Sequence, residues 1–257
     1  MKTFGIKSIP QVILVDVSSK EEIDRIMGFS TKDAYLKTLN DYLNGIGTLA
    51  YLKEKLKADP QSAELKFQIG QKYFYRGDQE AALPYLKTVI QTTPFHTAEH
   101  QTSAYYIGTI ELETSGKTAR LEQLAKTAND DIAQQSYTAL ARYYARQEEP
   151  EKEAAVLEAM ADRFNDDPQA LNSFAWRMTE LEMKLEKALA YAQKAAELSE
   201  VGSEDQAMIL DTVAEVHYKL GDKASAIAVI NKAIHIKPDD DYYKKQLAKF
   251  EQMDEEK

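Results

Sequence analysis

Residues 63–94 are AELKFQIGQKYFYRGDQEAALPYLKTVIQTTP, and residues 207–238 are AMILDTVAEVHYKLGDKASAIAVINKAIHIKP. The two segments share a small residue in the first half, a Gly-Asp pair in the middle, a second small residue after it and a final proline. Apolar residues recur at spacings of three and four on both sides of the Gly-Asp pair, which is typical of amphipathic helices. Each segment therefore predicts a hairpin of two helices.

The residues in the middle of each segment predict why the chain reverses there. Gly77 and Gly221 allow the left-handed backbone that often ends a helix. The carboxylates of Asp78 and Asp222 are suited to cap the helix that follows. The final proline of each segment cannot continue a helix and so ends the hairpin.

A repeat period of about 34 residues is visible in the spacing of four prolines, Pro60, Pro94, Pro168 and Pro238. Such a period is typical of stacked helical hairpins. Between the two clear segments, residues 97–128, 134–165 and 168–199 predict three further hairpins that lack the Gly-Asp turn. A polar helix over residues 240–253 is expected to cover the open end of the stack.

The order of small, aromatic, small and proline positions resembles the tetratricopeptide repeat (TPR), over residues 46–253. The resemblance implies a mainly α fold, a solenoid of about five repeats with a capping helix. It also implies a concave surface that binds a partner protein or peptide, and no catalysis by this chain. No cofactor is expected.

The first 44 residues follow a different pattern. Residues 11–16 and 22–29 predict an antiparallel strand pair, and a helix begins after Ser30 or Thr31 and continues through Tyr42. With Gly5-Ile6 and Ile9-Pro10 before the strands, this segment resembles the C-terminal half of a thioredoxin fold. We therefore expect two parts, a partial thioredoxin-like segment at residues 1–44 and the TPR solenoid at residues 45–257.

The chain contains no cysteine, so the Cys-x-x-Cys pair of the thioredoxin reaction is missing. Two interpretations stay open. The chain is internal to a longer thioredoxin–TPR protein, or it has kept only a docking remnant. The alternative function is accordingly a fragment of a thiol–disulfide oxidoreductase. As written, the chain is expected in the cytoplasm, whereas a longer bacterial parent of this type would often be exported to the periplasm.

An isolated pair of strands is marginally stable, and its open edge exposes unpaired backbone groups. We therefore expect either mobility of residues 1–30 or pairing with a second molecule. The second outcome would give a homo-oligomer through the N-terminal sheet edge, and hence a self-assembling module.

The composition limits the partners. The 257 residues carry 32 Lys and Arg against 42 Asp and Glu, a net charge of −10. An acidic chain gains no counterion-release energy from phosphates, so nucleic acid is not an expected partner. The longest aliphatic run, Val12–Val15, is far shorter than the roughly 20 residues that cross a bilayer, so no membrane partner is expected.

The sequence His96-Thr97-Ala98-Glu99-His100 matches the H-x-x-E-H motif of some zinc hydrolases. It also falls at the start of a repeat helix, where polar residues are ordinary, and no third ligand can be identified. The interpretation as the solvent-exposed start of a helix is preferred, and no metal-binding or catalytic residue is predicted. His217 replaces an aromatic packing residue, and so it is expected in the core or at an interface rather than in a metal site.

The candidate partner-binding residues are those that the first helix of a hairpin would direct toward the concave face. These residues are Phe67, Gln71, Phe74, Thr138, Arg142, Asn172, Trp176, Asp211, Glu215 and Tyr218. The set is rich in aromatic and amide groups, which suit an extended segment or a helix. Some TPR grooves clamp a terminal carboxylate with Lys and Asn, and this set departs from that pattern. The single tryptophan, Trp176, would serve either partner binding or packing between helices.

Overall fold

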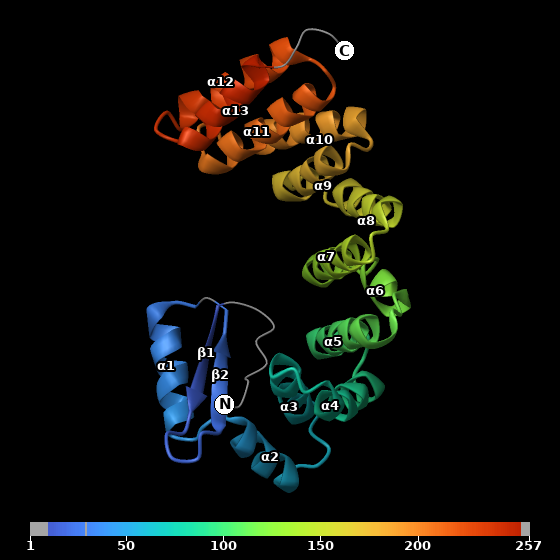
Figure 1. Cartoon of the computed structure of the whole chain (residues 1–257). Helices are drawn as coiled ribbons and strands as arrows, with labels where there is room; N and C mark the ends of the chain where they lie inside the picture. The colour runs from blue at the N-terminus through green and yellow to red at the C-terminus, as the bar shows by residue number, and fades with distance from the viewer. Residues whose placement is uncertain (1–9, 29, 253–257) are drawn as a thin grey trace. The chain divides into compact units, whose positions relative to one another are not determined.

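The computed structural model describes residues 10–28 and 30–252 (Figure 1). The chain divides into two compact units between Ser136 and Tyr137, and the division falls inside one helix. The predicted loop at residues 1–9 and the end of the second predicted strand, Phe29, lie outside the described residues.

The described residues form two strands and thirteen helices. The elements are β1 (Gln11–Val15), β2 (Glu22–Met27), α1 (Lys32–Leu43), α2 (Leu49–Ala58), α3 (Ala63–Tyr75), α4 (Gln79–Thr92), α5 (Ala98–Ser115), α6 (Ala119–Leu124), α7 (Asp130–Arg146), α8 (Pro150–Arg163), α9 (Pro168–Leu181), α10 (Leu185–Leu198), α11 (Glu204–Lys219), α12 (Lys223–Ile236) and α13 (Asp241–Glu251). The mainly α solenoid with a small N-terminal sheet is confirmed. None of the helices in this part of the chain is long and apolar enough to cross a membrane.

The first hairpin of the N-terminal unit consists of α3 and α4, and it depends on a close approach at Gly70. A Cβ atom built at Gly70 would lie 2.7 Å from Cδ2 and 2.9 Å from Cγ of Leu86, which is fully buried on α4. Only glycine leaves room for that side chain. Ile107 and Tyr106 of α5 then pack on the same core cluster.

The predicted turn geometry is confirmed in both clear hairpins. Gly77 and Gly221 have φ values of 75° and 84°, in the left-handed region. The Asp78 carboxylate accepts a hydrogen bond of 3.0 Å from the Ala81 N–H, and Asp222 accepts one of 3.0 Å from Ser225. These carboxylates satisfy N–H groups that the first helical turn leaves unpaired.

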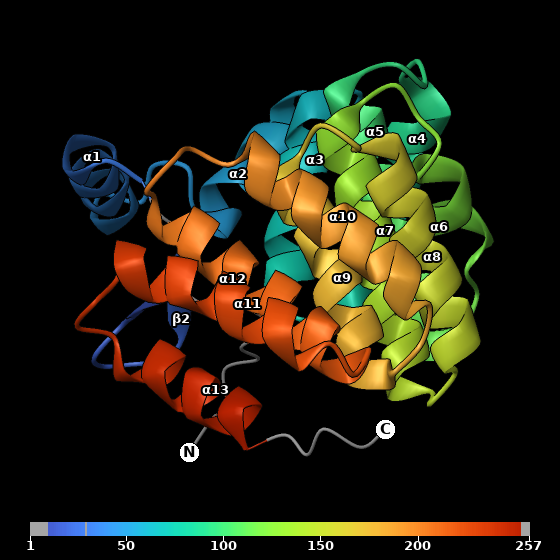
Figure 2. The same ribbon diagram turned by 90° about the horizontal axis from the view of Figure 1, so that it is seen from above.

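In the C-terminal unit, successive helices pack on one another, α9 on α10, α10 on α11 and α11 on α12, and α9 also contacts α11 (Figure 2). Alanines line the contacts between these helices, and Ala175, Ala192, Ala214 and Ala226 are fully buried. A second cluster joins α11 and α12 to α13 through Phe250. The predicted capping helix is therefore present, and it shields the apolar end of the stack.

The three weaker predicted hairpins each contain two successive helices, α5 and α6, α7 and α8, and α9 and α10. Contacts join α5 to α6 and α9 to α10. The second helix of the first of these pairs, α6, has only six residues. No element was predicted between the N-terminal helix and Ala63, where the structure forms α2. Leu49 and Leu52 of α2 are buried against Ile69 of α3.

The predicted antiparallel strand pair is present, with Val12 opposite Ile26 and Leu14 opposite Asp24. Within the described residues the sheet has two strands. The guanidinium of Arg76, the residue that follows α3, donates to the Ile23 carbonyl oxygen at 3.2 Å. A side chain of the first hairpin thus contacts the backbone of β2.

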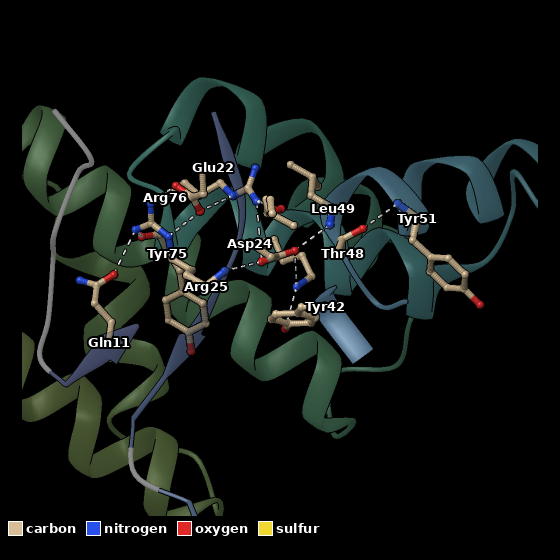
Figure 3. A network of polar contacts seen from close by, with 12 residues as sticks. Gln11, Glu22, Asp24, Arg25, Tyr42, Thr48, Leu49, Tyr51, Tyr75 and Arg76 are labelled. Carbon is tan, nitrogen blue, oxygen red and sulfur yellow. Dashed lines mark hydrogen bonds and ion pairs between the residues drawn. The ribbon is translucent and has the colours of Figure 1, made fainter. Parts of the chain in front are cut away.

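Asp24 joins β2 to the helices that follow (Figure 3). The residue is fully buried, and its carboxylate accepts 2.8 Å hydrogen bonds from the N–H groups of Arg25 and Leu49. The Lys72 ammonium lies 2.9 Å from Oδ2, and Arg76 Nη2 lies 3.7 Å from Oδ1. A buried carboxylate needs this many partners because burial removes its hydration.

Arg25 makes the second part of this network. Its guanidinium donates to Glu22 at 2.8 Å, to Gln11 at 3.2 Å and to the Tyr75 carbonyl oxygen at 2.8 Å (Figure 3). The strand pair is therefore fastened to the end of α3 by charge-assisted hydrogen bonds, which are stronger than neutral ones.

The substitution Gly70→Val tests the close approach of α3 and α4. The added atoms would overlap Leu86, so the free energy of unfolding is expected to fall by about 2 kcal/mol or more. Urea unfolding followed by circular dichroism measures the change. The matched control is Ala50→Val on the exposed face of α2, which is expected to cost only about 0.5 kcal/mol. Equal losses in the two variants would contradict the packing argument.

The substitution Asp24→Asn tests the buried network. It leaves Lys72 without its counter-charge, and the expected loss is about 3 kcal/mol in urea unfolding. The double variant Asp24→Asn/Lys72→Met should recover part of this loss, because no unpaired ammonium remains. Glu54→Gln, which removes an exposed pair with Lys57, serves as the control and should stay within about 0.5 kcal/mol of wild type.

Candidate binding surface

All ten predicted binding residues lie on α3, α7, α9 and α11, the first helices of four hairpins. Phe67, Gln71 and Phe74 belong to the N-terminal unit, and the other seven belong to the C-terminal unit. Their surroundings differ strongly from one helix to the next.

On α3 the predicted residues serve packing more than an open groove. Phe74 is only 9% exposed, and its ring stacks on Tyr106 with centroids 4.2 Å apart. Gln71 donates a 2.9 Å hydrogen bond to the Tyr106 hydroxyl, and Phe67 is half-buried against the same cluster. Burial raises the pKa of Tyr106 well above its usual range, so its hydroxyl remains protonated. Phe74, which was expected to line the concave face, is therefore buried against α5.

On α11 the predicted residues face the capping helix. Asp211 accepts hydrogen bonds from Tyr242 at 3.0 Å and from Gln246 at 3.3 Å. Glu215 accepts from Lys249 at 2.6 Å and 2.7 Å. Tyr218 is half-buried, with its ring centroid 5.2 Å from that of Phe250. All three residues are thus engaged by α13.

The pKa of Asp211 is raised to about 6, chiefly because burial disfavours the charged carboxylate. The hydrogen bonds from Tyr242 and Gln246 lower it, the Glu215 charge raises it, and the Lys249 charge lowers it. The effect of burial on the pKa is the largest because Asp211 is almost completely covered.

On α7 and α9 the predicted residues are more accessible. Arg142 is exposed and Thr138 is half-buried, and Trp176 is 37% exposed. Asn172 precedes Trp176 by one helical turn and is 8% exposed, yet its Oδ1 atom has no hydrogen-bond partner. Buried amide oxygens are normally paired, so Asn172 is an exception that needs an explanation.

Two hollows were not predicted from the sequence. In the N-terminal unit, a pocket of about 510 Å³ lies between β2, α1 and α3, and Gln71 lines it. In the C-terminal unit, a groove of about 1140 Å³ runs between α10, α11 and α12. The sequence did contain a signal for the first hollow. Asp24 and Arg25 interrupt an apolar strand, and buried charges need partners from other elements.

The H-x-x-E-H motif begins in the turn before α5 and ends in its first helical turn. His100 Nδ1 is 3.0 Å from the Thr93 carbonyl oxygen. Throughout residues 10–28 and 30–252, no three His, Asp or Glu side chains converge to hold a metal ion. His217 is largely buried, with Nδ1 3.4 Å from the Asp222 carboxylate.

The raised pKa of Asp211 predicts a dependence of stability on pH. Between pH 4 and pH 6 the folded chain holds a proton on Asp211 that the unfolded chain has lost, since the ordinary value is 3.8. The contribution of Asp211 to stability therefore falls as the pH rises through this window, by at most roughly 3 kcal/mol. Asp211→Asn should remove this part of the pH dependence. Parallel curves of unfolding midpoint against pH for the two proteins would contradict it.

Comparison with known proteins identifies the repeat. Residues 210–240 match the family model described as the tetratricopeptide repeat, while no curated protein matches the chain. YrrB, described as a TPR protein with an unusual peptide-binding site, has a TM-score of 0.52 and 16% identity, over 76% of this chain and 96% of that chain.

Two further solved structures are similar. A thermophilic TPR protein of Thermus thermophilus has 19% identity and a TM-score of 0.36, over 84% of this chain and 94% of its own. A TPR protein from Parabacteroides merdae has 14% identity and a TM-score of 0.42, over 86% of this chain and 80% of its own. From the repeat matched at residues 210–240 and the fold it shares with YrrB, the chain carries a tetratricopeptide repeat and has the fold of TPR proteins.

Proposed function

We propose that this chain is a non-catalytic scaffold that binds an extended segment of a partner protein on α9, at Asn172 and Trp176. The observation that carries the proposal is the Asn172 Oδ1 atom, which is buried but has no hydrogen-bond partner. Rotation of the Asn172 amide toward the exposed Trp176, one helical turn away, would let this oxygen accept a hydrogen bond from a peptide N–H. A solved protein of the same fold, YrrB, is described as having a peptide-binding site.

The energetics favour this place over the other predicted residues. A buried amide oxygen without a partner costs about 1–3 kcal/mol, and a ligand N–H would recover part of that cost. Trp176 offers a large apolar surface beside it, and tryptophan is enriched among residues that dominate binding energy. By contrast, Asp211 and Glu215 already have partners on α13.

The preceding hairpin supplies Thr138 and Arg142 at the same repeat positions as Asn172 and Trp176. Arginine is also enriched at interfaces. A segment crossing from one hairpin to the next would meet Arg142 as an additional hydrogen-bond donor. The net charge of −10 favours a partner segment that is neutral or basic overall.

Two other expectations stay predictions. The likeness of residues 1–44 to half of a thioredoxin fold would give a fragment of a thiol–disulfide oxidoreductase, but the 257 residues supply no thiol for that reaction. Homo-oligomer formation through the edge of the sheet would be visible as a dimer in light scattering. Neither expectation conflicts with peptide binding on α9.

Selection of peptides from a phage-displayed library of random dodecapeptides tests the proposed function. Peptides selected on the wild-type chain should bind Trp176→Ala at least about 10-fold more weakly, a loss of roughly 1.4 kcal/mol. Asn172→Ala should weaken binding by a similar factor, because the oxygen that receives the peptide N–H is gone. Trp176 is the only tryptophan, so its fluorescence should also shift to the blue when peptide covers it.

The matched control is Val201→Ala, which removes an apolar side chain that is 89% exposed on the loop between α10 and α11. This variant should bind the selected peptides as tightly as wild type. If the peptides bind Trp176→Ala with unchanged affinity, the proposed site is wrong.

A further inference from the structure

The pocket in the N-terminal unit is built from elements far apart in the sequence. β2 and α1 form two of its walls, and the face of α3 that carries Gln68 and Gln71 forms another. Its volume of about 510 Å³ falls within the range of roughly 300–1,000 Å³ that is usual for ligand pockets. It is separate from the proposed site on α9, which lies in the other unit.

The charges that line the pocket are balanced and already paired. Asp24 faces Lys72 at 2.9 Å, and Arg25 donates to Glu22. Asp41 pairs with Lys37 at 2.7 Å. A charged ligand would therefore find no unpaired counter-charge, and it would lose its hydration on entry.

The polar groups that retain bonding capacity are neutral. Gln68 and Gln71 lie one helical turn apart, and their amide nitrogens donate to Glu64 at 3.2 Å and to Tyr106 at 2.9 Å. Neither amide oxygen accepts a hydrogen bond from the described residues. The Tyr42 hydroxyl accepts from Lys72 at 3.0 Å, which leaves its own O–H able to donate.

The remaining lining is apolar. Ile26 and Leu52 are buried at the wall, Met27 is half-buried, and Ile46 is exposed at the pocket. A ligand that fits this surface needs an apolar body together with neutral donors and acceptors. A residue within a polypeptide has both, because its backbone amides flank its side chain.

We propose that this pocket binds one large, uncharged apolar residue of a partner polypeptide, with Gln68, Gln71 and Tyr42 pairing its backbone amides. The inference rests on the proposed function, since it takes the partner to be a protein. It adds a second contact point, on the N-terminal unit, and it names the chemistry of the residue that docks there.

N-acetyl-phenylalaninamide is the probe, because it presents an aromatic side chain between two uncharged amides. A ligand of this size is expected to bind with a dissociation constant on the order of 1 mM, measurable by saturation-transfer NMR. N-acetyl-phenylalanine carries a carboxylate in place of one amide, and it should bind at least about 5-fold more weakly because the pocket has no spare positive charge.

Two variants of the full chain locate the binding. Ala34 is exposed on α1 and lines the pocket, so Ala34→Phe fills the pocket and should weaken binding at least about 10-fold. Gln68→Met keeps the length of the side chain but removes its amide, and it should weaken binding about 3-fold or more. The control Ala50→Phe places the same bulk on the exposed face of α2, outside the pocket, and should leave binding unchanged.

The proposal is overturned if the amide probe does not bind at about 10 mM. It is also overturned if the carboxylate probe binds equally well, or if neither Ala34→Phe nor Gln68→Met weakens binding. Circular dichroism checks that each variant is folded, and Gln68→Met decides the matter if Ala34→Phe is not. Failure here leaves the dodecapeptide result on Trp176 untouched, so the two proposals fail separately.

Discussion

The packing of Leu86 against the backbone at Gly70 is the contact on which the first hairpin depends. Two helices joined by a short turn approach closely only where one of them has no side chain in the way, and a Cβ atom at Gly70 would lie 2.7 Å from Leu86. Gly108 has the same relation to Leu121 in the next hairpin, at 3.0 Å. In the C-terminal unit, buried alanines take this role. Small residues recur because two packed helices can approach closely only where one of them carries a small side chain. This close approach fixes which face of each helix is turned toward its neighbour.

The N-terminal strands depend on a different interaction. Two strands alone do not bury enough surface to be stable, and here Asp24 and Arg25 connect them to α2 and α3 through buried hydrogen bonds and ion pairs. Such a network is costly to bury and more costly to break, because the loss of one partner leaves an unpaired charge. It therefore holds β2 in a fixed position against α3. The pocket between β2, α1 and α3 is a consequence of that fixed placement.

Residues at the same repeat position differ in their hydrogen-bond partners from one hairpin to another. Asn172 and Asp211 are equivalent by repeat position, and both are buried. Asp211 is paired by Tyr242 and Gln246 of the capping helix, whereas Asn172 has an oxygen with no partner. The capping helix thus supplies the hydrogen-bond partners of Asp211 in the last repeat. Of these two equivalent residues, Asn172 on α9 is the one that retains bonding capacity, and so α9 is the better place for a partner.

The sequence by itself determined the helical hairpins, their turns and the capping helix. Helix periodicity, the left-handed glycines at positions 77 and 221, and the capping aspartates act within one or two helical turns, so they are visible in a single chain. It also determined which residues belong to the first helix of each hairpin. The tertiary structure alone decided which of these residues remain available to a ligand. Phe74 is covered by α5, Asp211 and Glu215 are engaged by α13, and Asn172 keeps an unpaired oxygen. The pocket beside Gln71 likewise depends on β2 and α1, which are distant in the sequence. Burial and pairing of a side chain depend on neighbours that no local pattern encodes, because those neighbours come from other helices and strands.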